Sequence, residues 1–258
     1  MTRLFTVIIF SSFIFIESNT PYKWKKDFEG DWTKEWGLKD DKKWGMENLK
    51  VLKEKNNYFL RAYFPKGSAS PNVTSFSGAP IGGGQFLNYL GKFDSLYFSY
   101  TVRFKENFQY NKGGKLPGLY GGAANSGGNI PTGYDGFSTR FMWRQEGIGE
   151  LYAYLPSSKQ WGTQIASAKW TFPDGTWHTI QHQVKLNDPD KSNGIIKVWI
   201  DGYLMHEERD LLFRKTDSLK INGIFFSTFF GGNDTTWASP EDTYIDFDDF
   251  VVSEKYID

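Results

Sequence analysis

Along most of the chain, apolar and polar residues alternate in short runs that are separated by clusters of glycine, asparagine, aspartate and proline. Alternation with a period of two is typical of a strand with one buried face. The pattern predicts strands at residues 58–64, 95–104, 137–144, 151–155, 179–186, 195–200, 223–230 and 244–252. Asp201-Gly202, which lies directly between the runs 195–200 and 203–206, is typical of a two-residue hairpin turn. Strands at this spacing predict an all-β fold, a two-sheet β-jelly roll of the concanavalin-like sandwich type.

The first 20 residues do not share this pattern, because Arg3 is followed by a mainly apolar run from Leu4 to Ile16. A positive residue before an apolar run of this length is typical of a secretory signal peptide, and the run is too short to span a membrane. We therefore expect a signal peptide at residues 1–20 and a single β-jelly-roll domain at residues 21–258. The mature chain is expected to be secreted, extracellular and without a membrane span.

The composition narrows the classes of function further. The 258 residues include 30 Lys+Arg and 30 Asp+Glu, and a net charge of zero argues against a nucleic-acid partner. The chain has no cysteine, which excludes disulfide bonds, thiolate metal sites and a cysteine nucleophile. Aromatic residues make up 18% of the chain and can form a large core. We expect a folded protein that acts as a monomer and uses other side chains for its chemistry.

The runs at 137–144 and 151–155 carry polar residues that a solvated sheet face does not usually have. A hairpin register that pairs Arg140 with Tyr152 also pairs Ser138 with Tyr154, because both pairs of residue numbers have the same sum. These four side chains then share one face, while the apolar side chains of the two runs share the other. Two interpretations remain open: packing of tyrosine against an arginine stem, and a binding surface with donors, acceptors and a fixed cation.

A second segment, residues 112–122, has the sequence Lys-Gly-Gly-Lys-Leu-Pro-Gly-Leu-Tyr-Gly-Gly. It is not a phosphate-binding P-loop, because the glycine spacing and the following Ser or Thr are absent. Leu116 and Pro117 beside Lys115 favour a loop of defined shape, and the glycines allow the backbone to approach a ligand. A mobile surface loop is the alternative.

The segments 113–118, 136–144 and 152–154 together resemble polysaccharide lyase family 14, which comprises alginate and glucuronan lyases with a β-jelly-roll fold. They are also similar to the fungal glucuronan lyases of family 20, which share that fold. The resemblance implies a lyase that cleaves a 1,4-linked polyuronate, either glucuronan or alginate, by β-elimination, a reaction for which we expect no cofactor to be required. It implies an active site made of Lys115, Ser138, Arg140, Tyr152 and Tyr154.

The chemistry of β-elimination fits these residue types. A base must remove the C5 proton, an acid must protonate the departing O4, and a cation must stabilise the charge that develops on the carboxylate. We expect Lys115 and Arg140 to neutralise the carboxylate, and Ser138 and Tyr154 to position the sugar. Because a nearby cation favours a phenolate, Tyr152 is expected to be both base and acid. An exchange of the base and neutraliser roles between Lys115 and Tyr152 also fits the sequence.

Several other residues are candidates for binding roles. Substrate contacts are expected at Gln85, Arg144 and Tyr120. A zero net charge then requires a local cationic groove for a polyanion, which we expect at Lys112, Lys115, Arg140 and Arg144. The acidic residues of 246–249 either bind a structural Ca²⁺ or form an acidic edge strand. His178 and His182 alternate in phase with apolar residues and are predicted to be buried structural histidines.

Two other functions are open alternatives. A non-catalytic carbohydrate-binding domain could stack its tryptophans on sugars and would need no cluster of lysine, arginine and tyrosine. A glycoside hydrolase on the same sandwich would need two carboxylates that flank the glycosidic bond. The chain has no Glu-x-Asp-x-x-Glu strand, the usual mark of sandwich hydrolases.

Overall fold

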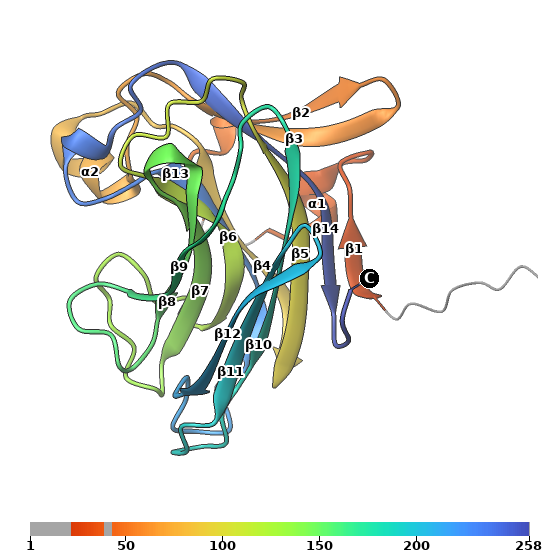
Figure 1. The fold of residues 1–258 in the computed structure, drawn as a ribbon, viewed down its shortest axis with the longest axis vertical. Coiled ribbons are helices and arrows are strands. Elements are labelled where there is room, and N and C mark those ends of the chain that lie inside the picture. The colour runs from red at the N-terminus through yellow and green to blue at the C-terminus, as the bar shows by residue number, and fades with distance from the viewer. Residues whose placement is uncertain (1–21, 39–42, 258) are drawn as a thin grey trace, which may run out of the picture.

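Two antiparallel β-sheets pack face to face in the computed structural model, which describes residues 22–38 and 43–257 (Figure 1). The predicted signal peptide lies outside these described residues. The eight-stranded sheet has the order β12 (Tyr203–Leu211), β11 (Gly194–Ile200), β10 (Trp177–Lys185), β5 (Ser95–Phe104), β14 (Thr243–Ser253), β3 (Asn57–Phe64) and β2 (Leu49–Glu54), and β1 (Tyr22–Lys26) pairs with β14. The six-stranded sheet has the order β4 (Gly84–Phe93), β13 (Ile221–Phe230), β6 (Gly114–Gly122), β7 (Gly136–Trp143), β8 (Ile148–Tyr154) and β9 (Thr163–Thr171).

The predicted jelly roll is confirmed, and each predicted run coincides with a strand. The predicted hairpin joins β11 to β12, where Asp201 and Gly202 have φ values of 51° and 82°. Two successive left-handed residues form the turn that matches the twist of a β-hairpin. In the described part of the chain, none of the helices is long and apolar enough to cross a membrane.

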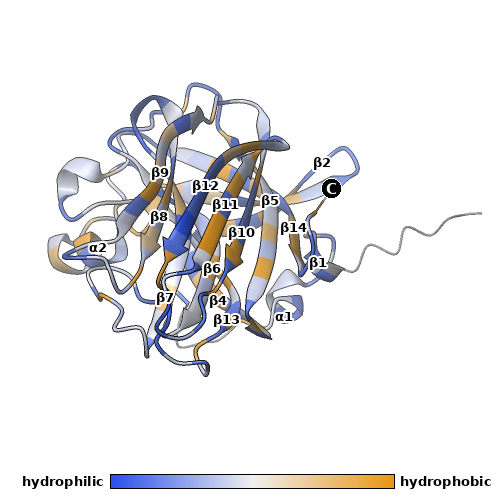
Figure 2. Ribbon diagram, turned by 60° about the horizontal axis from the view of Figure 1, so that its bottom comes forward, coloured by the Kyte–Doolittle hydropathy of each residue, from blue (hydrophilic) through white to orange (hydrophobic). Residues whose placement is uncertain are grey.

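Aromatic rings fill the space between the two sheets. Phe86 and Phe226 stack with ring centroids 4.6 Å apart, and Trp36 meets Phe250 at 4.8 Å. Trp36 directly follows the short helix α1 (Trp32–Glu35) and is fully buried in this core. Hydrophobic residues gather along β10 and β11, whereas the connecting loops are mainly hydrophilic (Figure 2). This aromatic core is the source of stability that a chain without disulfide bonds requires.

The segment 112–122 differs from its prediction, because most of it is the central strand β6 and not a loop. Its glycines allow neighbouring strands to come close: a Cβ on Gly118 would lie 1.8 Å from the carbonyl oxygen of Thr139. Pro117 sits where the register shifts against both neighbours, and a proline is tolerated in a strand at such a bulge. Glycine and proline are turn signals in a sequence, and pairing on both sides overrides them here.

Two short helical elements stand at one end of the six-stranded sheet. Helix α2 (Pro71–Ser77) begins after Ser70, whose hydroxyl accepts a hydrogen bond from the Val73 amide. The same hydroxyl donates to the carbonyl of Gly232 at 3.0 Å, just before the 3₁₀ helix η4 (Thr235–Trp237). The hydrogen bond holds the two elements together, and Figure 1 shows α2 and the blue turn of η4 side by side. Two further 3₁₀ helices, η2 (Met46–Asn48) and η3 (Gln145–Gly147), precede β2 and β8.

The acidic segment near the C-terminus is neither an edge strand nor an open carboxylate cluster. Strand β14 lies inside its sheet, between β3 and β5. Asp246 is fully buried between Arg61 and Arg103, at 2.7 and 2.9 Å, and Asp248 accepts a hydrogen bond from Asn57 at 2.8 Å. Among the described residues, no group of three His, Cys, Asp or Glu side chains is arranged to hold a metal ion.

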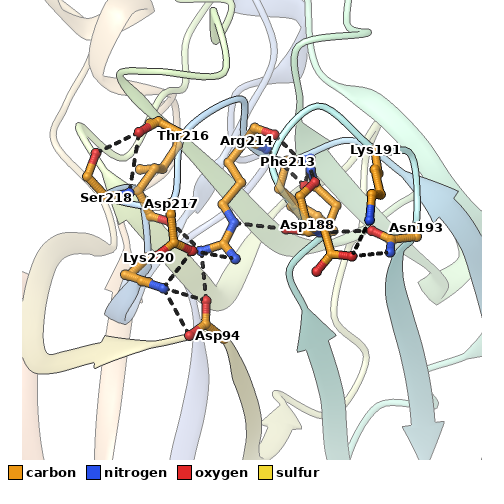
Figure 3. Close-up of polar contacts among 12 residues, drawn as sticks. Asp94, Asp188, Lys191, Asn193, Phe213, Arg214, Thr216, Asp217, Ser218 and Lys220 are labelled. Atoms are coloured by element: carbon orange, nitrogen blue, oxygen red, sulfur yellow. Dashed lines mark hydrogen bonds and ion pairs between the residues drawn. The ribbon is translucent and has the colours of Figure 1, made fainter.

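A buried arginine fixes the connection between β12 and β13 (Figure 3). The guanidinium of Arg214 donates to Asp94 at 2.7 Å, to the carbonyl of Leu219 at 3.0 Å and to the carbonyl of Asn187 at 2.9 Å. Asp217 lies 3.3 Å from the same guanidinium, and Lys220 donates to Asp94 at 2.7 Å. Every polar group of Arg214 therefore has a partner, and its charge is balanced by two carboxylates.

Candidate active site

A cleft of about 800 Å³ opens on the face of the six-stranded sheet that points away from the core. Side chains from five strands, with Arg144 directly after β7, form its floor: Gln85, Lys115, Arg140, Met142, Arg144, Tyr152, Tyr154 and Phe229. Its walls come from helix α2, from residues 126–129, from Trp161 and from the segment that contains η4. A volume of this size falls within the range of small-molecule and substrate sites.

The predicted hairpin register is confirmed. Arg140 pairs with Tyr152, and Ser138 pairs with Tyr154, across β7 and β8. The alternate residues Phe141 and Trp143 are fully buried in the core, so the sheet presents its polar side to the cleft. The register thus brings together side chains that the sequence separates by about a dozen positions.

Lys115 lies in the cleft with its amine close to two neighbours. Its Nζ atom is 2.7 Å from Sδ of Met142 and 3.7 Å from the centroid of the Tyr152 ring. Burial, followed by the positive charges of Arg140 and Arg144, lowers the pKa of Lys115 well below its usual 10.5. The environment therefore favours the neutral amine, which has a lone pair that can accept a proton.

Arg140 is buried, and the described residues provide no carboxylate for it. Its Nη1 donates to the Ser227 hydroxyl at 2.9 Å, its Cζ lies 4.5 Å from the centroid of the Phe225 ring, and its Nε has no hydrogen-bond partner. Burial lowers the pKa of Arg140 to about 10, so the guanidinium remains charged at neutral pH. A buried cation with an unused donor is a site for an anionic group.

Arg144 differs from Arg140, because a buried carboxylate holds it. Its Nε and Nη2 donate to Glu150 at 2.9 and 2.8 Å, which is a bidentate pair. Glu150 is fully buried and also accepts from Gln164 at 2.6 Å. No sequence motif singles out Glu150, although the same register places it opposite Met142 on the cleft face. The cluster of Lys115, Arg140 and Arg144 thus faces a single carboxylate.

Tyr152 and Tyr154 meet edge to face, with ring centroids 5.9 Å apart. Burial, helped by Tyr154, raises the pKa of Tyr152 to about 12, although Arg144 acts in the opposite direction. A nearby cation does favour the phenolate, but the expected lowering of the Tyr152 pKa is wrong, because the cost of desolvating the charged form is larger. Tyr152 is a protonated phenol at neutral pH, which is the form that can act as an acid.

The structure also separates residues that the sequence analysis grouped. Gln85 lines the cleft, as expected for a substrate contact. Ser138 is fully buried, and its hydroxyl donates to the Asn125 carbonyl at 2.6 Å, so it holds a loop and does not line the cleft. Tyr120 is packed in a small cluster with Ala124 and two other apolar residues, also outside the cleft. The loop that follows β6 covers both positions, which strand alternation alone does not reveal.

Exposed aromatic side chains on the cleft walls were not predicted either. Phe76 and Trp161 are 67% and 41% exposed, and both line the cleft. Trp237 also lines it, with Lys112 and Arg144 about 6 Å from its ring. The sequence indicated that tryptophans could stack on sugars in a binding domain, but which aromatic side chains are exposed depends on tertiary contacts. Rings of this kind on a wall are suited to contact with sugar rings.

The predicted role of the histidines as buried structural residues is confirmed. His178 lies 2.9 Å from Asp201, in the eight-stranded sheet. His182 is fully buried and 3.3 Å from the Thr139 hydroxyl, and burial lowers its pKa to about 3. None of the described residues that line the cleft is a histidine, aspartate or glutamate.

The jelly roll and its cationic, aromatic-walled cleft define a protein that acts on carbohydrate. The model of the polysaccharide lyase 14 family matches residues 52–250, so the chain belongs to that family and is a polysaccharide lyase. No curated protein sequence matches the chain.

Solved structures that are similar to this chain include alginate and glucuronan lyases. The marine PL-14 alginate lyase from Aplysia kurodai is 29% identical, with a TM-score of 0.77 over 90% of this chain and 98% of that one. An alginate lyase from a Chlorella virus is 22% identical, with a TM-score of 0.69 over 81% and 89%. The endo-β-1,4-glucuronan lyase from the fungus Trichoderma reesei is 12% identical, with a TM-score of 0.52 over 91% and 92%. The last two show a shared fold.

Proposed function

We propose that this lyase cleaves a 1,4-linked polyuronate, of the alginate or glucuronan type, by β-elimination. The observation that carries the proposal is Arg140, a buried guanidinium at the cleft floor with no carboxylate partner among the described residues. A uronate carboxylate supplies the missing charge and accepts from the unused Nε. The activities of the similar enzymes, alginate and glucuronan lyases, point to the same class of substrate.

Lys115 is the base in this proposal, and Tyr152 is the acid. Arg140 binds the C6 carboxylate, which stabilises the negative charge that develops there. The neutral amine of Lys115 takes the C5 proton, the C5–H electrons form the C4=C5 double bond, and the C4–O4 bond breaks. The Tyr152 hydroxyl gives its proton to O4. The ammonium and phenolate that result lie next to each other, and proton transfer between them restores the starting state.

The relative positions of the base and the acid favour particular uronates. The Lys115 amine lies above the Tyr152 ring, so both groups approach the sugar from one side. In D-mannuronate and D-glucuronate the C5 proton and O4 are on the same side of the ring, and in L-guluronate they are on opposite sides. We therefore expect syn elimination on polymannuronate and glucuronan, with polyguluronate a poorer substrate.

One assay tests the proposed function and its alternatives. Purified protein is incubated with glucuronan, polymannuronate and polyguluronate, and the ultraviolet absorbance of the unsaturated uronate end is followed. We expect new absorbance with the first two polymers. Reducing ends without absorbance would indicate hydrolysis, and binding without either product would indicate a carbohydrate-binding protein; both results would contradict the proposal.

We also propose that the protein is exported and acts outside the cell. The proposal rests on residues 1–20, where Arg3 precedes an apolar run of signal-peptide length. Expression of the full sequence in a secreting host, followed by N-terminal sequencing of the protein in the medium, tests it. We expect a new N-terminus close to residue 21. Retention of the whole chain inside the cell would contradict the proposal.

A further inference from the structure

Trp161 is a large apolar side chain of the cleft wall, and the proposed chemistry gives it no role. It belongs to the loop 155–162 between β8 and β9, lines the cleft and is 41% exposed. Tryptophan side chains are mostly buried in folded proteins, and exposed apolar side chains that line a cleft are typical of ligand contact. The exposed part of this ring is therefore available to a ligand in the cleft.

The ring of Trp161 rests against the backbone of the other wall loop, which joins β6 to β7. A Cβ built on Gly128 would lie 3.3 Å from Cζ3 of Trp161, so a side chain at position 128 would crowd the ring. Gly128 also has a φ of 91°, which favours glycine. Its amide donates a hydrogen bond to the Tyr154 hydroxyl at 3.1 Å, which ties this backbone to strand β8. The two loops and Tyr154 therefore form one connected wall that supports the ring.

The loop that carries Trp161 is held at its base by a buried serine. The Ser158 hydroxyl accepts a hydrogen bond from the Leu155 amide at 3.1 Å and lies 2.8 Å from the Thr163 hydroxyl. The Ser158 amide donates to the Leu155 carbonyl at 2.9 Å. These bonds link the end of β8 to the start of β9, so the loop is anchored to both strands that it joins.

The order of the strands places this loop relative to the proposed base and acid. Lys115 is on β6, Arg140 on β7 and Tyr152 on β8, and the loop leads directly into β9, the next strand of the sheet. The loop also borders the Tyr152 ring, because a Cβ built on Gly162 would lie 2.5 Å from its Cε1. Neighbouring strands are about 4.8 Å apart. Lys115 and the loop that carries Trp161 therefore lie on opposite sides of Tyr152 across the sheet.

We propose that Trp161 is a specificity-determining residue whose ring stacks on the sugar unit that departs beyond O4. In β-elimination the C5 proton and the C4–O4 bond belong to one sugar unit, and O4 links that unit to the departing one. The inference rests on the proposed function, in which Lys115 takes the C5 proton and Tyr152 protonates O4. The direction from Lys115 to Tyr152 then leads from the retained unit to the departing unit, which meets the indole ring with its apolar C–H face. The non-reducing part of the polymer accordingly lies towards β9.

The first test measures turnover of polymannuronate by wild type, Trp161→Ala, Trp161→Phe and Tyr203→Ala. Tyr203 is the matched control, an aromatic residue that is 75% exposed on the eight-stranded sheet. We expect Trp161→Ala to raise KM by about tenfold and to leave kcat within about threefold of wild type, because stacking holds the sugar equally before and during the reaction. Trp161→Phe, which keeps an aromatic face, should recover most of the loss, and Tyr203→Ala should keep the wild-type KM.

The second test identifies the side of the cleavage point that the ring contacts. Calorimetry measures binding of two ligands to Lys115→Met, which lacks the base, and to the double variant that also carries Trp161→Ala. One ligand is a mannuronate tetrasaccharide. The other is an unsaturated mannuronate trisaccharide, a product that ends in the C4=C5 double bond and has no unit beyond C4. We expect Trp161→Ala to weaken binding of the tetrasaccharide by about tenfold and that of the trisaccharide by less than about twofold.

Each outcome of these tests supports or overturns the proposal. A wild-type KM in Trp161→Ala, with unsaturated product still formed, would overturn the inference and leave the proposed function intact. Equal weakening of the two ligands would place the ring on the retained side and would also overturn it. Wild-type protein that yields no unsaturated product would overturn the proposed function and the inference together. If Trp161→Ala fails to fold, Trp161→Leu, which keeps apolar bulk without a ring, should show the same rise in KM.

Discussion

Arg140 and Arg214 are both buried, and their surroundings differ in a way that separates function from structure. Arg214, at 4% exposure, has two carboxylates and two backbone carbonyls around its guanidinium (Figure 3). Arg140, at 2% exposure, has one serine hydroxyl, one aromatic ring and an unused Nε. A buried cation without a partner reduces stability, whereas a satisfied network supports the fold.

The difference between the two arginines indicates that unpaired charge reduces stability in the cleft, where that charge is available for chemistry. Even with Lys115 neutral, the cleft holds Arg140 and Arg144 against the single carboxylate of Glu150, so its charge is unbalanced until a polyanion enters. The network around Arg214 has no such excess and lies away from the cleft. Zero net charge for the whole chain therefore conceals a cationic site, with acidic residues such as Asp246 neutralised in the other sheet.

The largest effect is expected from Lys115→Met. Loss of the base should lower kcat by about 10²- to 10⁴-fold, which turnover on polymannuronate measures. Retained turnover with a raised KM would reassign Lys115 to substrate binding.

The same variant should also change how stability depends on pH. The unfolded chain keeps the Lys115 proton up to the usual pKa of 10.5, while the folded protein releases it at lower pH. Wild-type stability relative to Lys115→Met should therefore rise as pH increases towards 10.5 and level off above it. Urea unfolding of both proteins at several pH values measures this, and a difference that does not change with pH would contradict the lowered pKa.

Arg140→Met should lower kcat by about 10²- to 10³-fold, because one preorganised cation beside the developing carboxylate charge is lost. Turnover on polymannuronate measures the loss. Arg214→Met is the matched control, since it removes an equally buried guanidinium away from the cleft, and it should leave kcat within about twofold of wild type. Equal losses in the two variants would remove the distinction between the two arginines.

Glu150→Gln should have a moderate effect, a decrease of about tenfold in kcat. Glu150 raises the pKa of Lys115, so its loss should lower that pKa further and move the rising limb of the pH–rate profile to lower pH. Ser167→Ala, which removes a weaker partner of the same carboxylate at 3.4 Å, is the control and should keep the wild-type profile. A shift of the limb to higher pH would contradict the proposed charge coupling.

The smallest effect on activity is expected from Arg214→Met, with a clear effect on stability. Several charged hydrogen bonds are lost, and we expect the free energy of unfolding to fall by about 2 to 3 kcal/mol. Chemical denaturation measures it, with the exposed Lys191 nearby as a control position for Lys191→Met. An unchanged unfolding free energy would mean that the network in Figure 3 does not stabilise the fold.

The sequence predicted the fold and the centre of the site because both depend on local alternation. The register of β7 with β8 follows from which face must be buried, and it placed Arg140 and Tyr152 together. The same register would have identified Glu150, had it been extended by one more pair. Strand β6 could not be predicted, because its glycines and Pro117 signal turns, and only the close approach of two neighbouring strands explains them.

The remaining differences between the sequence predictions and the structure arise because loops that are distant in sequence bury the residues concerned. The sequence suggested that cations would lower the pKa of Tyr152, but the surrounding strands and wall loops bury it, and burial has the larger effect. Ser138 is on the predicted face, yet the loop through Asn125 covers it.

The most direct test of the unbalanced cleft is the thermal melting of wild-type protein and Arg140→Met, with and without a saturating polymannuronate oligosaccharide. The difference between Arg140 and Arg214 predicts that free Arg140→Met melts at or above the wild-type temperature, because it lacks a buried, unpaired cation. The oligosaccharide should raise the melting temperature of wild type and leave that of Arg140→Met nearly unchanged. A free variant that melts lower than wild type and gains the same increase from the ligand would contradict the assignment of Arg140 to the substrate carboxylate.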